Sequence, residues 1–154
     1  MTAANMDFPP PAGCVSTSSP PDSRTDSEIS ISLTSHIPTT DSEKNVWAYW
    51  HTGFKSMPPW TQRNVIAWCR RLGPSWTIRV LDNVPGSPNN ALNFVPREYF
   101  PPAFNSGKMT GPYVATHSAD LARLPLLQLY GGIWLDVGIM LVRDLNSLLS
   151  LIHI

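Results

Sequence analysis

The stretch HSADLARLPLLQLYGGIWLDVGIML, residues 117–141, decides the fold. Its first half predicts a helix, with Ser118 placed to cap it and Asp120 in the first turn. The apolar positions that point to a buried helix are Leu121, Leu124, Leu127 and Leu129. Because these leucines are so closely spaced, the helix is predicted to be covered nearly all round, inside a layered domain rather than on its surface.

A glycine turn and a strand follow the helix. Gly131 stands where helices commonly end in a left-handed residue, and Gly132 prolongs the turn. The continuous apolar run 133–135 is typical of a parallel strand that is buried on both faces. Asp136 comes next, at the carboxyl end of this strand. Open α/β sheets bind their ligands beyond the carboxyl ends of their strands, so Asp136 is a candidate ligand for a metal or a substrate.

The preceding residues predict a strand–helix–strand unit. The aromatic and β-branched run 46–50 predicts a first strand, and the alternation of apolar and polar residues over 76–80 predicts a second. Between them, residues 60–72 have the apolar spacing of a helix, which Gly73 and Pro74 end. Such a βαβ unit joins parallel strands by a right-handed crossover. The predicted class is therefore α/β, with a mostly parallel sheet flanked by helices.

Composition divides the chain into two parts. About half of the first 44 residues are Ser, Thr or Pro, and few are large and apolar. Burial of so little apolar surface cannot offset the entropy of ordering, so residues 1–44 are predicted to be a disordered tail. Residues 45–154 then form the folded part. Within it, the segment 83–116 is rich in Pro, Asn and Gly, and a connection of this length is usually functional or partly disordered.

Charge and cysteine content exclude several classes of protein. The formal net charge is zero and no basic cluster is present, so no nucleic-acid partner or anionic membrane surface is expected. Cys14 and Cys69 are too sparse for a disulfide framework or a zinc site. No signal peptide and no transmembrane segment is visible, which would make the protein cytoplasmic if the chain is complete.

Three segments together resemble a known family. They are VWAYWHTG (46–53), GPSWTIRVLD (73–82) and the stretch 117–141. They look like the amino-terminal half of sugar-transferring proteins with a "DXD" motif, in particular fungal members of the capsular polysaccharide synthesis family. The order S-D-x-x-R, apolar helix, G-G-I-W-L-D is similar to that of GT-A glycosyltransferases, including the large clostridial glucosylating toxins. A compound pattern of this kind is more specific than any single motif.

The resemblance implies a Rossmann-like GT-A fold, of which residues 45–154 would be the nucleotide-sugar-binding half. The domain would therefore be incomplete. It also implies that Asp136 holds Mn²⁺ or Mg²⁺ against the donor diphosphate. Gly138 occupies the position of the second carboxylate of the family motif, which weakens this expectation, although Mg²⁺ often has only one or two carboxylate ligands. The plainer alternative is that Asp136 caps the turn after the strand.

The resemblance assigns four further residues to the donor site. Asp120 and Arg123 would bind the sugar hydroxyls or ribose, with Arg123 also close to phosphate; the alternative is a surface ion pair three residues apart on a helix. Trp50 would stack on the nucleotide base, and Trp134 matches an aromatic residue near the donor. Both tryptophans read equally well as core residues.

Three classes of function stay open at this point. The chain could be part of an active glycosyltransferase that moves a sugar from a nucleotide-sugar donor to a glycan, lipid or protein acceptor. It could be a truncated, catalytically inactive remnant, or an α/β module that uses the donor pocket for recognition only. A complete downstream half in the gene would favour the first class. No catalytic base can be named from these residues.

Overall fold

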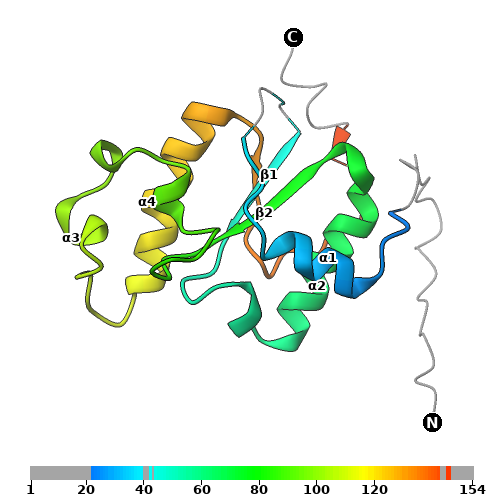
Figure 1. Cartoon of the computed structure of the whole chain (residues 1–154), viewed down its shortest axis with the longest axis horizontal. Coiled ribbons are helices and arrows are strands. Elements are labelled where there is room, and N and C mark those ends of the chain that lie inside the picture. Colours follow the sequence, from blue (N-terminus) through cyan, green and yellow to red (C-terminus); the bar gives the residue numbers. More distant parts are fainter. Residues whose placement is uncertain (1–21, 40–41, 43, 143–144, 147–154) are drawn as a thin grey trace.

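The computed structural model describes residues 22–39, 42, 44–142 and 145–146. Its centre is a parallel three-stranded sheet with the order β2-β1-β3 (Figure 1). β1 spans Asn45–Tyr49, β2 spans Thr77–Leu81 and β3 spans Ile133–Trp134. In register, Val46 pairs with Ile78 on one side and with Ile133 on the other. The predicted α/β class with a parallel sheet is confirmed.

Helices cover both faces of this sheet. α1 (Asp26–Leu33) and α2 (Pro59–Leu72) lie on one side, and α3 (Pro102–Asn105) and α4 (Val114–Tyr130) lie on the other (Figure 1). Short 3₁₀ helices at Phe54–Ser56, Gly73–Ser75, Ala91–Asn93 and Arg97–Tyr99 join these elements. The elements therefore make three layers, helix, sheet and helix.

β1 connects two separate hydrophobic clusters. Val46 and Ala48 belong to the cluster under α1 and α2, whereas Trp47 and Tyr49 belong to the cluster under α4. Successive side chains of a strand point to opposite faces, so a strand with helices on both sides must be apolar throughout. This requirement explains the aromatic and β-branched run from which the first strand was predicted.

The prediction that order begins near Asn45 was wrong. Helix α1 is capped by a reciprocal pair of hydrogen bonds between Thr25 and Glu28, and its Ile29 and Leu33 are 0% and 2% exposed in the core. Composition averaged over 44 residues obscured a short segment with two apolar residues at helical spacing. Residues 1–21, which the same prediction included, lie outside the described residues.

A buried arginine fastens the chain between α1 and β1 to the sheet. The Arg79 side chain donates to the backbone oxygens of Ile37 and Pro38 and to Asn45 Oδ1, at 2.6–2.9 Å. Its guanidinium also lies 4.8 Å from the centre of the Trp47 ring. Burial lowers the pKa of Arg79 to about 10. The segment before the sheet is therefore part of the folded unit.

Helix α4 differs from its prediction in two ways. It begins at Val114, so Ser118 is not its cap but a fully buried residue in its second turn. Its buried residues are Ser118, Ala122, Pro125 and Leu126, while Leu124 is 71% exposed. In the described part of the chain, α4 packs on the sheet by one face only. The expectation of burial nearly all round was wrong.

The turn after α4 was predicted correctly. Gly131 and Gly132 have φ angles of 60° and 90°, and a Cβ on Gly132 would lie 2.3 Å from the backbone oxygen of Asn45. Glycine is thus required for the close approach of this turn to β1. The strand that follows is short and half-buried rather than buried on both faces, because among the described strands it pairs with β1 alone.

The segment 83–116 is folded rather than partly disordered. Its apolar side chains Phe94, Val95, Phe100 and Phe104 are buried in the cluster under α4. Phe100 and Phe104 stack with ring centres 4.1 Å apart. Within this segment, Arg97–Tyr99 form one 3₁₀ turn.

Candidate functional site

The loop after β3 is held by side chains of α2. Leu135 N donates to Trp47 O at 2.9 Å, which continues the ladder one residue past the strand. Asn64 Nδ2 donates to the backbone oxygens of Val137 and Ile139, each at 2.7 Å, and Trp68 Nε1 also donates to Ile139 O at 2.7 Å. These bonds fix the loop backbone on either side of Asp136, whose side chain is 71% exposed.

Four of the five predicted site residues meet at this loop. We call Asp120, Arg123, Trp134 and Asp136 the Arg123 cluster. Arg123 Nη2 lies 3.2 Å from Asp120 Oδ1 and 3.9 Å from Asp136 Oδ1. The Arg123 guanidinium lies 5.1 Å from the centre of the Trp134 ring, whose Nε1 donates to Asp136 Oδ1 at 3.0 Å. Residues from α4 and from the carboxyl end of β3 thus form one connected group.

The charges of this cluster do not balance. Two carboxylates surround one guanidinium, which leaves a formal surplus of one negative charge. The side chains of Asp120 and Arg123 are 58% and 37% exposed, so their ion pair contributes little to stability, roughly 0–1 kcal/mol. Arg123 Nε is nevertheless buried, and no group among the described residues accepts a hydrogen bond from it. The cluster therefore has one uncompensated negative charge and, among the described residues, one N–H donor without an acceptor.

Asp136 can contribute one free oxygen to a cation. Its Oδ1 is occupied by Trp134, while Oδ2 accepts no hydrogen bond from any described residue. In the described ranges, no three His, Cys, Asp or Glu side chains converge on one point. A single carboxylate suits a hard cation only if phosphate oxygens and water complete its coordination. The residues present thus fit a divalent cation that arrives together with a diphosphate.

Position 138 has room for a side chain. Gly138 does not have a positive φ, and no atom of the described residues lies within 4 Å of the place where its Cβ would be. Neither backbone conformation nor packing requires glycine there. The fold would therefore accept the second motif carboxylate at position 138, although this sequence has glycine there.

Trp50 is not brought into the Arg123 cluster. It lies just past the end of β1, where its backbone N donates to Leu81 O at 2.8 Å. Its side chain is partly buried and packs against the hydrophobic cluster under α1 and α2. The structure thus supports a packing role for Trp50, and stacking on a base stays a prediction.

A tyrosine at the end of β1 was missed by the sequence analysis. The hydroxyl of Tyr49 lies 3.3 Å from His51 Nδ1 and also interacts with Ser118 of α4. Burial is the main reason that the pKa of Tyr49 rises to about 12. Tyr49 lies in the run 46–50 from which the first strand was predicted, but nothing in the sequence indicated that its hydroxyl would meet α4.

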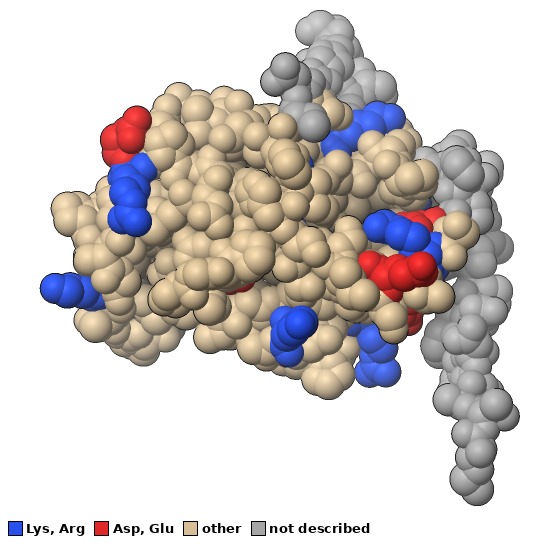
Figure 2. Space-filling model, viewed as in Figure 1, with Lys and Arg blue, Asp and Glu red and all other residues tan. Residues whose placement is uncertain are grey.

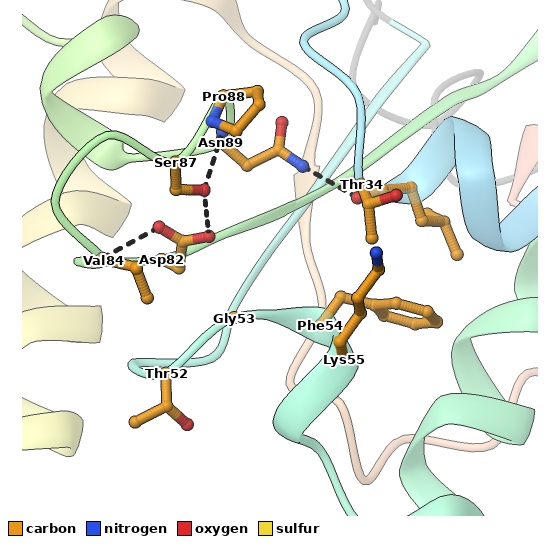
Figure 3. Close-up of a pocket in the computed structure, with 11 residues that line it drawn as sticks. Thr34, Thr52, Gly53, Phe54, Lys55, Asp82, Val84, Ser87, Pro88 and Asn89 are labelled. Atoms are coloured by element: carbon orange, nitrogen blue, oxygen red, sulfur yellow. Dashed lines mark hydrogen bonds between the residues drawn. The ribbon is translucent and has the colours of Figure 1, made fainter.

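A small pocket lies at the same edge of the sheet, beyond the carboxyl end of β2 (Figure 3). Its volume is about 230 Å³, and Thr34, Gly53, Lys55, Asp82 and Asn89 are among its lining residues. Asp82 is 4% exposed even though it is charged, because Ser87 Oγ and Val84 N donate to its two oxygens at 2.7 and 3.0 Å.

Asn89 gives this pocket an unused acceptor. Its Nδ2 donates to Leu33 O at 2.8 Å, whereas its buried Oδ1 has no partner among the described residues. Neither Asp82 nor Asn89 was singled out from the sequence. Asp82 follows the second predicted strand, and its position at the carboxyl edge of the sheet was the available signal.

Charged side chains are sparse on the face shown in Figure 2; some lie beside a side chain of opposite charge, and several Lys or Arg side chains stand alone. Among the described residues, Arg24 forms an ion pair with Asp22, and Arg70 forms one with Asp26. That view shows no wide patch of one sign.

A comparison with models of known protein families gives a match that covers most of the described residues. The sequence model of a family described as "Capsular polysaccharide synthesis protein" matches residues 22–151. The chain belongs to the capsular polysaccharide synthesis protein family. The match begins before α1, in agreement with the packing of that helix in the core, and it includes the whole Arg123 cluster.

Curated relatives of this family member are fungal proteins. An O-glycosyltransferase of Phomopsis amygdali, PaGT, is 57% identical over 141 residues, which cover 90% of this chain and 34% of that protein. The glycosyltransferase afumC of Aspergillus fumigatus is 55% identical over 125 residues, or 80% of this chain and 32% of the relative. The chain thus spans about a third of the length of these relatives.

No solved structure matches the chain significantly, so the GT-A subtype of the fold stays a prediction. Within the described residues, no helix combines the length and the apolar character needed to cross a membrane.

Proposed function

We propose that this chain is the donor-binding part of a glycosyltransferase, which transfers a sugar from a nucleotide-sugar donor to a glycan, lipid or protein acceptor. The observation that carries the proposal is the meeting of Asp120, Arg123 and Asp136 at the carboxyl edge of a parallel sheet. Ligands of open α/β sheets bind at that edge. Relatives more than half identical over most of the chain are named glycosyltransferases.

The three charged residues of the Arg123 cluster each suit one part of such a donor. The exposed nitrogens of Arg123 suit the diphosphate, since a planar guanidinium binds phosphate oxygens in pairs. Asp120 lies on the same helix face and can accept hydrogen bonds from hydroxyl groups of the sugar or ribose. Asp136 would hold Mn²⁺ or Mg²⁺ together with the diphosphate. When bound, that cation would stabilise the departing nucleoside diphosphate as a Lewis acid.

Gly138 favours a second candidate function. Without the second carboxylate, the chain could bind a nucleotide-sugar for recognition and not catalyse its transfer. Sugar transfer or slow hydrolysis of a bound donor would distinguish the enzyme from the binding module. Both functions require that the donor binds.

Thermal unfolding in the presence of donor tests this shared requirement. A panel of nucleoside diphosphates and nucleotide-sugars with Mn²⁺ should contain members that raise the melting temperature. A ligand at a hundred times its Kd adds about 2.7 kcal/mol to the free energy of unfolding. If the protein unfolds cooperatively and no member of the panel shifts the transition, the donor-binding proposal is refuted.

A further inference from the structure

The Arg123 guanidinium lies close to Asp136, where a bound cation would neutralise the negative charge of that carboxylate. The same nitrogen, Nη2, is within 4 Å of a carboxylate oxygen of Asp120 and of Asp136. Oppositely charged groups at these separations attract each other appreciably even in a partly solvated site. Arg123 is therefore the positive charge that both acids share while no ligand is bound.

Arg123 is held in place without using all of its donors. Its guanidinium is stacked near Trp134, which restrains its position. Its contacts with acids are made through Nη2, whereas the buried Nε has no acceptor among the described residues. Leaving a buried N–H unpaired is unfavourable, so the guanidinium loses little if a ligand draws it into another position.

These positions make a cation and a diphosphate mutually dependent. A divalent cation at Asp136 would be repelled by the nearby guanidinium, and a diphosphate at Arg123 would be repelled by two nearby carboxylates. If both bind, the diphosphate draws Arg123 away from Asp136 and the cation neutralises Asp136. Because coupling between two binding sites is reciprocal, each ligand then raises the affinity for the other by the same factor.

We propose that Arg123 is the internal counter-cation of Asp136 and couples the binding of a divalent cation to the binding of a diphosphate. This inference rests on the proposed function, because it concerns the same donor site. Arg123 thus weakens the binding of the cation alone while strengthening the binding of the two ligands together. A residue that served only to bind phosphate would not weaken cation binding.

Calorimetric titrations of the 154-residue chain test the coupling. The ligands are Mn²⁺ alone, inorganic diphosphate alone, and the preformed complex of the two. Diphosphate is the chemical group that nucleotide-sugar donors share, so the titration does not depend on the unknown base and sugar. For the wild-type protein we expect the complex to bind at least about fivefold more tightly than either ligand alone, as coupled sites commonly do.

The variant Arg123→Gln separates coupling from simple binding. Without the guanidinium, Asp120 and Asp136 lose their counter-charge, so Mn²⁺ alone should bind several-fold more tightly than to the wild-type protein. The complex should bind more weakly, because its phosphate partner is lost. Arg123→Lys, which keeps the charge without the planar fork, should leave the affinity for Mn²⁺ alone close to that of the wild-type protein. The matched control is Arg97→Gln, since Arg97 donates to Asn105 O, away from the cluster.

The outcomes separate this inference from the proposed function. If the folded wild-type chain binds no preformed complex, donor binding fails and the inference fails with it. If the wild-type chain binds the complex and Arg123→Gln does not tighten Mn²⁺ binding, the inference alone is overturned. Tighter Mn²⁺ binding in both Arg123→Gln and Arg97→Gln would also overturn it, because net charge would then explain the effect. Opposite changes in the two affinities, confined to Arg123→Gln, support it.

Discussion

Trp134 Nε1 donates a hydrogen bond of 3.0 Å to Asp136 Oδ1, two residues further along the chain. Trp134 is the last residue of β3 and Asp136 lies two residues further on, and the two side chains lie on the same side of the backbone. The bond turns one carboxylate oxygen toward the indole and leaves Oδ2 as the oxygen available to a ligand. Trp134 thus restricts the direction in which Asp136 can act.

The variant Trp134→Phe removes this hydrogen bond and keeps an aromatic ring beneath Arg123. We expect the Mn²⁺–diphosphate complex to bind about five- to tenfold more weakly, because a hydrogen bond of this kind contributes about 1 kcal/mol. Calorimetry measures the change. Trp60→Phe is the matched control, since Trp60 is 59% exposed on α2 and outside the cluster. Equal losses in both variants would contradict a role of the indole N–H.

The variant Asp136→Asn separates ligand binding from structure. It keeps the shape of the side chain but removes the charge that a divalent cation needs. We expect the Mn²⁺-dependent part of nucleotide binding to disappear, and stability to change by less than roughly 1 kcal/mol at so exposed a position. Titrations with and without Mn²⁺, together with urea unfolding, measure both effects. An unchanged dependence on Mn²⁺ would show that Asp136 is structural.

Gly138→Asp restores the carboxylate that the motif lacks. Since the backbone at Gly138 does not have a positive φ and the space around it is open, the variant should fold normally. We expect Mn²⁺ alone to bind more tightly, because two carboxylates would then face one cation. Gly138→Asn, of the same shape without the charge, is the control. Equal affinities for Mn²⁺ in the two variants would place residue 138 outside the cation site.

Stability measurements can test the packing of α1. Ile29 is fully buried and Ile31, on the same helix, is 66% exposed. Ile29→Ala should cost about 2–5 kcal/mol in the free energy of unfolding, because it leaves a cavity in the core. Ile31→Ala should stay within about 0.5 kcal/mol. Chemical denaturation of the two variants would give similar values if α1 were not packed on the sheet.

The two glycines after α4 should tolerate alanine unequally. Gly131→Ala would place alanine in a backbone conformation (φ 60°, ψ −158°) that is nearly restricted to glycine, with open space around it, so it should cost about 1–3 kcal/mol. Gly132→Ala adds a collision with the backbone oxygen of Asn45, and the cost should exceed about 3 kcal/mol. Comparison of the two unfolding midpoints checks this. Similar midpoints would mean that β1 does not approach the turn so closely.

Local patterns were sufficient to predict the three strands and the helices α2 and α4, but not α1. The run at β1, the alternation at β2 and the glycines at 131 and 132 each depend on neighbouring residues only, so their chemistry is visible in the sequence. The true beginning of α4 was not, because Tyr113 makes no side-chain cap and Val114 starts the helix without a conventional signal.

The grouping of the candidate site residues could be predicted where family spacing and local geometry agree. Asp120 and Arg123 lie one helical turn apart, and Trp134 and Asp136 leave the same strand, so each pair was recognisable from spacing. That both pairs meet depends on how α4 packs on the sheet, which spacing does not reveal. The unpaired Nε of Arg123 and the unpaired Oδ1 of Asn89 depend on long-range packing in the same way.

The division of β1 between two hydrophobic clusters limits how this protein can change during evolution. Val46 and Ala48 are small and face one helical layer, while Trp47 and Tyr49 are large and face the other. Conservative replacements at any one of these positions alter volume on one side only. Insertion or deletion of a single codon within the strand would send the large rings to the layer built for small side chains and reverse every later position. Homologues should therefore differ in composition along this strand but never in its phase.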